Sequence, residues 1–438
     1  MQRTDIPLEP ARTIQCTVQL ASWTPEGLAR GQITTDADEQ LPAGTFVEVL
    51  GGIPGELVEV SISFLAIWRP KQRKHPKAPI VRLIKVLQSS PDRTAHLCSV
   101  FGDCGGCRLQ HLPYPQQLQW KQDRVRQTFS DNGIIDALVL APIGMTDPWH
   151  FRNQMRFAIN RDGVAGLTAY GTHRVIPLQH CPIAHNRIND TLVITQESPQ
   201  PRPQLLLRCG HYTDEVLMQP APDAATLTRL HHAGVDLHTD QFHERLLGLD
   251  FSIRPSSFFQ TNTIQAEVMA QIVLNALPST TNITVADAYC GVGTFAAILA
   301  TKATKVIAIE ESASAVKDAR ANMERLQIHN VEVLLGKTEH LLPTLTDTLD
   351  VVVLDPPRMG CMPDVISALR TRQVTRIIYI SCDPATLARD AASLCSENVY
   401  QLTSVQPLDM FPQTHHIECI AIFDNTIPED RSLLEDNT

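Results

Sequence analysis

From about residue 262 onward, stretches with helical spacing of apolar residues alternate with short, uninterrupted apolar runs. This alternation constrains the fold strongly, because strands separated by helices pair in parallel and are covered by those helices on both faces. The pattern predicts helices at 263–276, 295–303, 313–326 and 365–371, and strands at 284–288, 305–309, 331–335, 350–354 and 376–381. We therefore expect a Rossmann-like, doubly wound α/β domain over residues 251–424, with its ligand site at the carboxyl ends of the strands.

The chain of 438 residues is long enough for more than one domain. Residues 10–87 contain short β-rich runs at 14–20, 46–49 and 57–64, separated by turns that contain Gly and Pro. Closely spaced strands of this kind predict a small β-barrel. Residues 88–250 combine a helical pattern at 115–129 with strand-like runs at 152–160 and 216–218, so we expect a mixed α+β central domain there. Residues 425–438 are expected to form an acidic tail.

Hydrophobic residues make up 43% of the chain and charged residues 19%, which is typical of a globular protein and not of a disordered one. The formal net charge of −10 excludes a uniformly basic, nucleic-acid-coating protein. Residues 69–93 depart from this balance, because they contain eight Lys or Arg and a single acid, Asp92. The segment is either a solvated loop or a phosphate-binding face beside the predicted barrel.

Residues 1–12 contain no apolar core of a signal peptide, and no run of the chain approaches the ~18 apolar residues of a membrane-spanning helix. We therefore expect a cytoplasmic protein with no membrane partner. Its eleven Cys would stay reduced there and serve as core residues, metal ligands or nucleophiles.

Three strand ends of the predicted sheet carry residues that suit a nucleoside-containing ligand. The first strand runs into the corner DAYCGVGT at 287–294, where glycine lets the backbone turn sharply and approach a ligand closely. Glu310 ends the next strand and can accept hydrogen bonds from both hydroxyls of a ribose. Asp355 ends a third strand, and the two prolines after it fix the loop. The combination resembles the class I S-adenosylmethionine-dependent methyltransferases.

Cys382 ends a further strand, in the sequence SCDPAT at 381–386. At this place the thiol can point into the ligand cleft, and the N-terminus of the helix expected near Ala385 would favour the thiolate. The alternative is a buried cysteine that packs against the sheet, which is the commoner role of this residue type.

From about residue 94 to 424 the chain resembles the uracil-5 RNA methyltransferase family, in both the order and the spacing of its motifs. The matching stretches are Cys98-x5-Cys104-Gly-Gly-Cys107 with RLQHL after it, FFQTN at 258–262, DAYCGVGTF at 287–295, LDPPRMG at 354–360, SCDPAT at 381–386 and HHIEC at 415–419. The N-terminal segment is similar to the TRAM domain, an RNA-binding barrel that many members carry.

The resemblance implies a role for each motif. Cys382 would be the nucleophile that adds to C6 of uracil, and Glu418 would be the base that removes the C5 proton. The uracil must leave its stack to reach the pocket, so the RNA would present a flipped or looped-out uridine. In the glycine corner many relatives have Asn at the position of Thr294. The residues that would contact S-adenosylmethionine are Gln260, Tyr289, Thr294, Glu310 and Asp355.

A metal site is expected in the central domain. Cys98, Cys104 and Cys107 lie close together in the sequence, and Cys181 is the best fourth ligand because family members with a cluster have Cys in this place. Four thiolates suit either zinc or an iron–sulfur cluster. The resemblance favours a 4Fe–4S cluster, and four protein ligands favour a structural role that orders the central domain for RNA binding.

The sequence thus predicts an RNA uridine C5-methyltransferase that makes 5-methyluridine. The TRAM-like segment and the cysteines favour 23S ribosomal RNA as the target; the alternatives are the T-loop of tRNA and, less in keeping with Cys382 and Glu418, a non-catalytic iron–sulfur RNA-binding protein. The chemistry of the RNA cytosine-5 methyltransferases is disfavoured, because Pro357 is followed by Arg358 rather than Cys, and Cys361 lies too far on. We expect a monomer.

Overall fold

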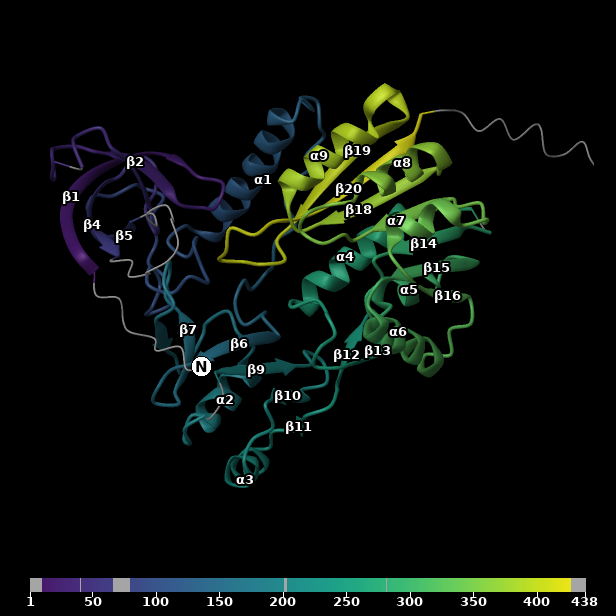
Figure 1. The fold of residues 1–438 in the computed structure, drawn as a ribbon, viewed down its shortest axis with the longest axis horizontal. Coiled ribbons are helices and arrows are strands. Elements are labelled where there is room, and N and C mark those ends of the chain that lie inside the picture. Colours follow the sequence, from purple (N-terminus) through teal and green to yellow (C-terminus); the bar gives the residue numbers. More distant parts are fainter. Residues whose placement is uncertain (1–9, 40, 66–78, 201–202, 281, 427–438) are drawn as a thin grey trace, which may run out of the picture.

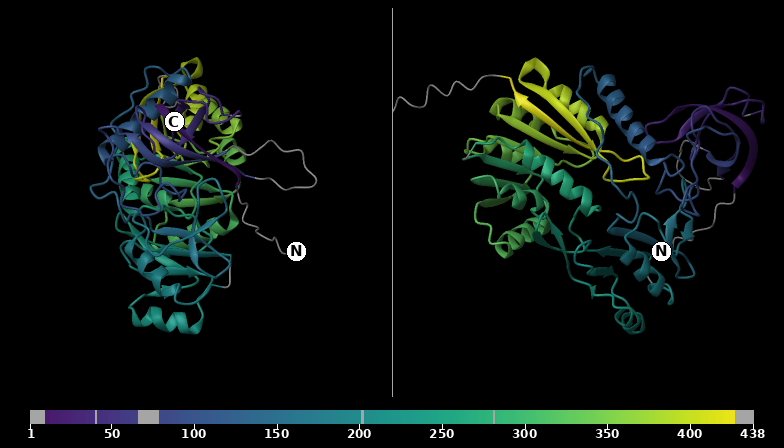
Figure 2. Two further views of the ribbon diagram at one scale, coloured as in Figure 1. Left: turned by 90° about the vertical axis from the view of Figure 1, so that its left-hand side faces the viewer. Right: turned by 180° about the vertical axis from the view of Figure 1, so that it is seen from behind.

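The computed structural model describes residues 10–39, 41–65, 79–200, 203–280 and 282–426. These residues form sheets of five, six and seven strands and one two-stranded sheet. The five-stranded and seven-stranded sheets lie at opposite ends of the molecule, and helix α1 (Tyr114–Asp131) lies between them (Figure 1; Figure 2, right). Among the helices of this described part, none combines the length and the apolar character that crossing a membrane requires.

The N-terminal sheet is antiparallel, with the strand order β3-β2-β1-β4-β5. It curls around an apolar core that includes Val18, Val49 and Val60, and a bridge between Leu50 and Arg82 joins its two edges. The expected small barrel is therefore present as a strongly curled, barrel-like sheet, although the sequence pattern did not predict β2 and β5. The strands are β1 (Pro10–Trp23), β2 (Ala29–Ile33), β3 (Phe46–Val49), β4 (Leu57–Leu65) and β5 (Ile80–Gln88).

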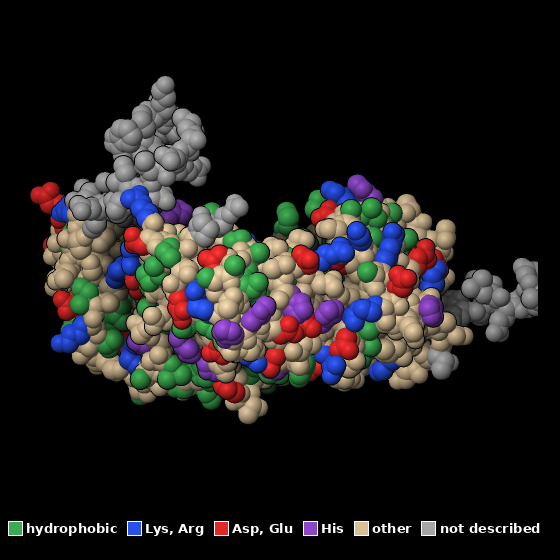
Figure 3. Space-filling view, turned by 90° about the horizontal axis from the view of Figure 1, so that it is seen from below, with side chains coloured by type: hydrophobic (Ala, Val, Ile, Leu, Met, Phe, Trp, Pro, Cys, Tyr) green, Lys and Arg blue, Asp and Glu red, His purple; other side chains and the backbone are tan. Residues whose placement is uncertain are grey.

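The basic segment at 69–93 is only partly within the described residues, since 66–78 lie outside them. In the described part, Arg93 forms an ion pair of 2.6 Å with the buried Glu56, and Arg82 lies 3.0 Å from Asp103. On the face of the molecule that Figure 3 shows, acidic and basic side chains are interspersed. Because Arg82 and Arg93 already have carboxylate partners, a phosphate-binding face on this segment stays a prediction.

The six-stranded sheet has the order β11-β10-β9-β6-β7-β8. Helices α2 (Asn186–Thr195) and α3 (Ala224–His232) share its apolar core through Ile188 and Leu230. The predicted strand-like runs at 152–160 and 216–218 correspond to β6 and β10. The strands are β6 (Gln154–Ile159), β7 (Ala165–Thr168), β8 (Val175–Pro177), β9 (Gln204–Cys209), β10 (Val216–Gln219) and β11 (Leu237–His238); a hairpin of β12 (Phe242–Leu246) and β13 (Leu249–Ile253) follows.

The C-terminal sheet has the order β16-β15-β14-β17-β18-β20-β19, in which β14 to β18 are parallel and β20 is antiparallel to both of its neighbours. The parallel, doubly wound part is the one that the alternating pattern predicts, and it is confirmed. The last two strands were not predicted. The strands are β14 (Thr284–Ala288), β15 (Lys305–Glu310), β16 (Val331–Leu335), β17 (Val351–Leu354), β18 (Arg376–Ser381), β19 (Tyr400–Leu408) and β20 (Glu418–Asn425).

Alternate residues of each strand of this sheet enter different cores, as the period of two in a strand requires. Val351 and Val353 of β17 share one core with helices α4 (Thr263–Ala276), α5 (Thr294–Leu299) and α6 (Ala313–Arg325). Val352 and Leu354 share the other with α8 (Pro363–Arg372), α9 (Pro384–Leu394) and Phe129 of α1; the short helix α7 (Thr338–Leu341) follows β16. Helix α1 therefore packs onto the sheet of the C-terminal half.

The strand order reverses at β14, which has β15 on one side and β17 on the other. Loops that leave the carboxyl ends of such strands diverge and leave a crevice at that edge. The carboxyl ends of the five parallel strands lie along this edge, and so does the beginning of the antiparallel β20. Five strand ends and Glu418 thus meet at one edge of the sheet.

Candidate active site

The corner between β14 and α5 is a sharp turn that depends on its glycines. Tyr289, Gly291 and Gly293 all have positive φ, of 71°, 56° and 83°. A Cβ on Gly293 would lie 2.9 Å from the Cε of Met323, so the turn packs closely against α6. The N–H of Cys290 donates to the carbonyl oxygen of Ile309 (2.9 Å), which ties the corner to β15. This local geometry agrees with the sharp, glycine-dependent turn that the sequence indicates.

Glu310 connects this corner to the next helix. Its Oε2 accepts from the N–H of Gly291 (3.0 Å), and its Oε1 accepts from the N–H of Ser312 (2.7 Å). A carboxylate can accept about four hydrogen bonds. Glu310 therefore keeps capacity for the two ribose hydroxyls that the sequence analysis assigned to it.

Asp287 is a second acidic residue of the corner, and the sequence analysis did not select it. It is fully buried on β14, and neither of its carboxylate oxygens has a hydrogen-bond partner of normal geometry. Its pKa is raised to about 8, mainly by burial and also by Asp355 and Glu310, while the nearby backbone N–H of Ala296 opposes the shift. The signal was available, because Asp287 is the first residue of the corner sequence. A buried carboxylate without a partner is costly unless a ligand satisfies it.

Asp355 follows β17 and completes an acidic group at the crevice. Its N–H lies 3.3 Å from the carbonyl oxygen of Ala288, so the loop after β17 begins against the corner after β14. Burial raises the pKa of Asp355 to about 7. Asp287, Glu310 and Asp355 therefore form a site that favours a positively charged ligand.

Cys382 directly follows β18, and Glu418 is the first residue of the neighbouring strand β20. Ser381 of β18 is paired with Cys419 of β20, so the next residues along the two antiparallel strands are Cys382 and Glu418. Glu418 is buried, with 5% of its surface exposed, and Cys382 is partly exposed. The two residues that the resemblance names as nucleophile and base thus meet at the crevice, although 36 residues separate them in the sequence.

The charges around this pair raise both pKa values. The pKa of Cys382 is raised to about 11, mainly by burial; the neighbouring Glu418 contributes to the shift and Arg358 opposes it. Burial also raises the pKa of Glu418 well above its ordinary value, to which Asp355 adds and which Arg358 opposes. Cys382 is therefore a neutral thiol at neutral pH, and burial disfavours the charged form of Glu418.

Contrary to expectation, the pKa of Cys382 is raised although this residue lies beside the N-terminus of α9. Asp383 is the N-cap residue, and its Oδ1 accepts from the N–H groups of Ala385 (2.9 Å) and Thr386 (3.3 Å). These are the amides that would otherwise be free to stabilise the thiolate. Burial and the proximity of Glu418 consequently outweigh the helix terminus.

The loop after Asp355 is held against α9. The N–H of Cys361 donates to Oδ2 of Asp390 (2.8 Å), and Tyr379 donates to the same oxygen (2.7 Å). Gly360 has φ of 78°, and a Cβ there would lie 2.6 Å from that oxygen. Cys361 is buried against this network. A nucleophilic role of Cys361 therefore has no support in the geometry.

Gln260 lies between β13 and α4 and is partly buried. Its carbonyl oxygen accepts from Nδ2 of Asn153 (3.0 Å), and two residues later Asn262 caps α4 and donates to the carbonyl oxygen of Met410 (3.1 Å). The segment is thus fixed between the central sheet and the loop before β20. The partly buried Thr294 is the first residue of α5.

The four cysteines predicted as metal ligands line one cavity of 310 Å³, together with Arg152 and His416. Cys98, Cys104 and Cys181 are buried. Burial raises the pKa of Cys107 first of all, and the charges of Cys181, Cys104 and Cys98 raise it further, so the four thiols are close enough to interact. Four thiolates this close together would need a cationic group between them, and the donor set therefore fits a metal site.

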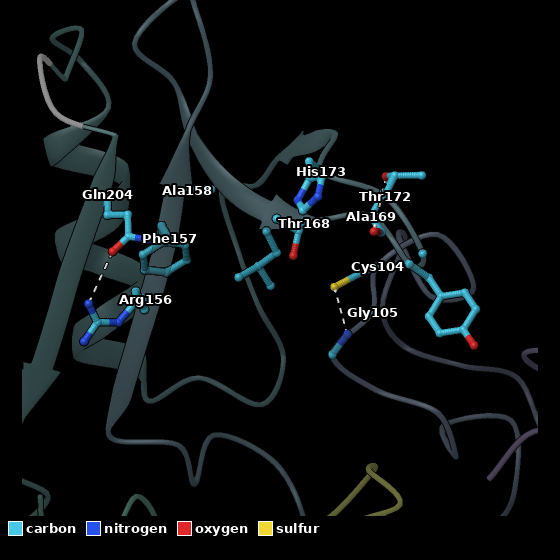
Figure 4. Close-up of a pocket in the computed structure, with 14 residues that line it drawn as sticks. Cys104, Gly105, Arg156, Phe157, Ala158, Thr168, Ala169, Thr172, His173 and Gln204 are labelled. Carbon is cyan, nitrogen blue, oxygen red and sulfur yellow. Dashed lines mark hydrogen bonds between the residues drawn. The ribbon is translucent and has the colours of Figure 1, made fainter. Parts of the chain in front are cut away.

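The four cysteine sulfurs do not form a tightly closed group of ligand atoms. Within the described residues, the one group of three or more His, Cys, Asp or Glu whose ligand atoms all lie within 4.8 Å of one another is Glu215, Asp236 and His238. No three of the four cysteine sulfurs meet that limit. Figure 4 shows the adjoining groove of 620 Å³, into which Cys104 and Gly105 extend opposite Phe157 of β6.

Comparisons with known proteins give one consistent picture. Residues 225–425 match the family model described as tRNA (Uracil-5-)-methyltransferase. An uncharacterized RNA methyltransferase of Gloeobacter violaceus is 33% identical, over 96% of this chain and 99% of its own. Another, from Thermosynechococcus vestitus, is 32% identical, over 94% of this chain and 97% of its own.

One solved structure resembles nearly the whole chain. It is the tRNA (uracil-54, C5)-methyltransferase of Pyrococcus abyssi in complex with S-adenosyl-L-homocysteine. The TM-score is 0.68 at 23% sequence identity, and the match covers 92% of this chain and 99% of that one. The three large sheets therefore follow one another along the chain as in the fold of that structure.

Proposed function

This chain belongs to the uracil-5 RNA methyltransferase family and is an S-adenosylmethionine-dependent RNA (uracil-5)-methyltransferase, and on that premise we propose that Cys382 is its nucleophile and Glu418 its base. The observation that carries the proposal is the pairing of Ser381 with Cys419, which brings Cys382 beside Glu418 at the edge where Asp355 also lies.

Cys382 makes the uracil ring reactive. When its Sγ adds to C6, the electrons of the C5=C6 bond move toward O4, and C5 becomes a carbon nucleophile. S-adenosylmethionine, when bound, supplies the methyl group that C5 takes up. The exposed Arg358 lowers the pKa of Cys382, against the effect of burial, and so helps form the thiolate.

Glu418 completes the reaction. Its carboxylate takes the proton from C5, the electrons of that C–H bond form the C5=C6 double bond, and the C6–S bond breaks to return the thiolate of Cys382. Burial raises the pKa of Glu418, so its carboxylate is a stronger proton acceptor than an exposed one.

The cofactor would lie at the acidic crevice. We assign Gln260, Tyr289, Thr294, Glu310 and Asp355 to it, as the resemblance implies, and add Asp287. The unpartnered carboxylate of Asp287 supports this placement, because S-adenosylmethionine carries a positively charged ammonium and a sulfonium group. Asp287 would accept from the ammonium group, directly or through a water molecule.

The four-cysteine cavity would hold a 4Fe–4S cluster. A tetrahedral zinc site has Zn–S bonds of about 2.3 Å and thus sulfur atoms only about 3.8 Å apart. No three sulfurs of Cys98, Cys104, Cys107 and Cys181 all lie within 4.8 Å of one another, which supports a larger group. Iron and sulfide in the anaerobically purified protein are the expected result; zinc alone at one ion per chain would overturn the assignment.

We propose 23S ribosomal RNA as the target, with tRNA as the alternative outcome. The barrel-like sheet at the N-terminus and the cysteine set support ribosomal RNA, as argued from the sequence. Mapping 5-methyluridine in both RNAs from a strain that lacks the protein decides between them. A missing modification in the T-loop of tRNA, with ribosomal RNA unchanged, would overturn the ribosomal target.

The mechanism is tested with two variants and RNA from that strain. Cys382→Ala should form no covalent RNA adduct and should not methylate, whereas Glu418→Gln should accumulate an adduct that survives denaturing electrophoresis. Cys395→Ser is the matched control, because Cys395 caps the C-terminal end of α9 whereas Cys382 precedes its N-terminal end, and it should behave as the unmodified protein. Normal turnover in Cys382→Ala would exclude the proposed nucleophile.

A further inference from the structure

The loop at residues 409–417 leads directly into Glu418 and contains no helix or strand of its own. In Figure 1 this loop, in yellow, extends from the seven-stranded sheet toward the lower end of α1. Its position therefore depends on the neighbours to which it is hydrogen-bonded. Most of these neighbours lie on α1 and on the segment that follows Cys107.

Helix α1 contacts the loop through a stripe of polar residues. Tyr114, Gln117 and Lys121 have the spacing i, i+3 and i+7, which places them on one face of the helix. Tyr114 and Lys121 donate to the carboxylate of Asp409, and Lys121 also donates to the carbonyl oxygen of Phe411 (3.0 Å). Gln117 and Lys121 are each only 1% exposed.

Gln413 is held from two sides. Its side chain and its backbone are bound by one residue, since Nε2 of Gln117 donates to Oε1 of Gln413 (2.9 Å) and the N–H of Gln413 donates to Oε1 of Gln117 (3.1 Å). The carbonyl oxygen of Gln413 accepts from the N–H groups of Arg108 and Leu109, both at 3.0 Å. Gln413 has φ of 68°, so it keeps a left-handed conformation five residues before Glu418.

The contact between α1 and the loop at 409–417 buries polar groups, which makes it less favourable in free energy than an apolar contact of the same size. Burying an amide or an ammonium group costs free energy that its hydrogen bonds only partly offset, and an apolar stripe would pack without that cost. Directional hydrogen bonds differ from apolar contacts in fixing one backbone path. The arrangement therefore favours a precise position of the loop over stability.

We propose that Gln117 and Gln413 are positioning residues for Glu418, so that α1 and the segment after Cys107 hold the base in place for the removal of the C5 proton. The inference rests on the proposed function. In that step Glu418 gains the proton from C5, the C–H electrons form the C5=C6 bond, and the C6–S bond breaks toward Cys382. Cys382 leaves the sheet from β18 and is held by the Asp383 cap of α9, not by this loop.

Removal of the C5 proton, which depends on the loop at 409–417, can thus be separated experimentally from the earlier attack of Cys382 on C6. A displaced Glu418 slows the breakdown of the methylated adduct, whereas Cys382 still attacks C6. A misplacement on the order of 1 Å can lower a rate about a hundredfold. Loss of the contact with Gln413 should consequently make the covalent adduct accumulate.

The test compares two glutamines of α1. Gln117→Leu removes both side-chain hydrogen bonds to Gln413 at nearly constant volume. Gln122→Leu is the matched control, since the buried Gln122 lies on the same helix but donates to the carbonyl oxygens of Val139 and Leu140. Metal content and S-adenosylmethionine binding are measured on every protein to confirm that the fold and both sites persist.

For Gln117→Leu we expect kcat to fall by about tenfold or more, KM to change little, and the RNA held in denaturation-resistant adduct to rise severalfold. Gln122→Leu should match the unmodified protein. A purely structural role of Gln117 would instead lower metal content and adduct formation together. Equal adduct accumulation in both variants, or adduct breakdown at the normal rate in Gln117→Leu, would overturn the inference.

A second variant covers the case in which Gln117→Leu does not fold. Gln413→Gly keeps the carbonyl oxygen that Arg108 and Leu109 bind and suits the positive φ, but it removes the side chain that Gln117 holds. It should accumulate adduct in the same way, and normal breakdown in it would contradict the inference. Cys382→Ala and Glu418→Gln test the premise separately: if these two fail to behave as a nucleophile and a base variant, the proposed function is wrong, whatever Gln117→Leu does.

Discussion

Lys121 and Asp409 form an ion pair whose two side chains are 1% and 0% exposed, with Nζ 2.5 Å from Oδ1. The pair joins helix α1 to the first residue of the loop that leads to Glu418. Tyr114 donates to the other carboxylate oxygen of Asp409 at 2.8 Å, so both oxygens of this buried carboxylate accept a hydrogen bond. Burial lowers the pKa of Lys121, and the charge of Asp409 opposes that shift. Removing either partner would leave an isolated charge in the interior.

We therefore expect Lys121→Met to lower the free energy of unfolding by about 3 kcal/mol. In the double variant Lys121→Met, Asp409→Asn, most of this loss should be recovered, because the buried negative charge is gone while Tyr114 keeps an acceptor. Urea unfolding followed by tryptophan fluorescence measures both. A loss in the double variant as large as in the single one would contradict the explanation.

The reactivity of Cys382 should depend on its charged neighbours. Burial is the main reason for its raised pKa of about 11, and Glu418 adds to the shift while Arg358 opposes it. Glu418→Gln should therefore move the pH profile of alkylation to lower pH, and Arg358→Met should move it to higher pH. Iodoacetamide labelling of Cys382, quantified by mass spectrometry against Cys395, gives the profiles. Shifts in the opposite directions would rule out this electrostatic account.

Asp287 should make the unliganded protein less stable as the pH rises. Its pKa is raised to about 8 by burial, so the folded protein keeps a proton that the unfolded chain loses above about pH 4. Stability is then present below about pH 4 and is lost progressively toward about pH 8. Asp287→Asn should be more stable than the unmodified protein at the upper end of this range, by more than about 1 kcal/mol.

The same variant tests the place of Asp287 in the cofactor site. If Asp287 accepts from the ammonium group, Asp287→Asn should bind S-adenosylmethionine about tenfold more weakly, which corresponds to about 1.4 kcal/mol. Isothermal titration measures the change. A variant that is stabilised at high pH yet binds the cofactor with full affinity would assign Asp287 to the core alone.

Removal of the metal group should reproduce the phenotype of Gln117→Leu. Arg108 and Leu109, which bind the carbonyl oxygen of Gln413, follow Cys107 directly. Cys181→Ser should lose the metal group and with it the visible absorbance of an iron–sulfur cluster. The segment after Cys107 would then no longer be held in place, so the protein should accumulate covalent adduct on RNA. Cys209→Ser is the control, because Cys209 is buried in the same sheet region but lines no part of the cavity. Normal turnover without metal would exclude a role of the cysteines in the reaction.

The sequence predicted those parts of the fold whose signal is local. The strands at 284–288, 331–335 and 376–381 agree with β14, β16 and β18 to the residue, because each is a short, mostly apolar run between helical segments. Strands β14 and β18 lie inside the sheet and are buried, whereas β16 is an edge strand in which only Val333 is buried. Strands β19 and β20 were not predicted. Their place depends on a ladder in which β20 inserts between β18 and β19, and such a non-local pairing leaves no mark in a short window of sequence.

The candidate residues could be named from the sequence motifs, whereas their pKa values could not be predicted from the sequence. The order of the motifs named Cys382 and Glu418, and the structure brings them together through the pairing of Ser381 with Cys419. The pKa of Cys382 could not be predicted, since it depends on burial and on Glu418, which lies on another strand. The spacing of the four cysteine sulfurs likewise depends on how the segment around Cys181 packs against that of Cys107.

The sequence by itself determined the parallel sheet and the glycine corner, because these depend on short-range patterns of apolar and special residues, and the resemblance of its motifs named the candidate reactive side chains. Only the tertiary structure decided that Gln117 and Lys121, polar residues that a helical pattern would leave in water, are buried against the loop before Glu418. The physical reason is that burial of a polar group is acceptable only where a partner distant in the sequence completes its hydrogen bonds, and that partner exists only after the chain has folded.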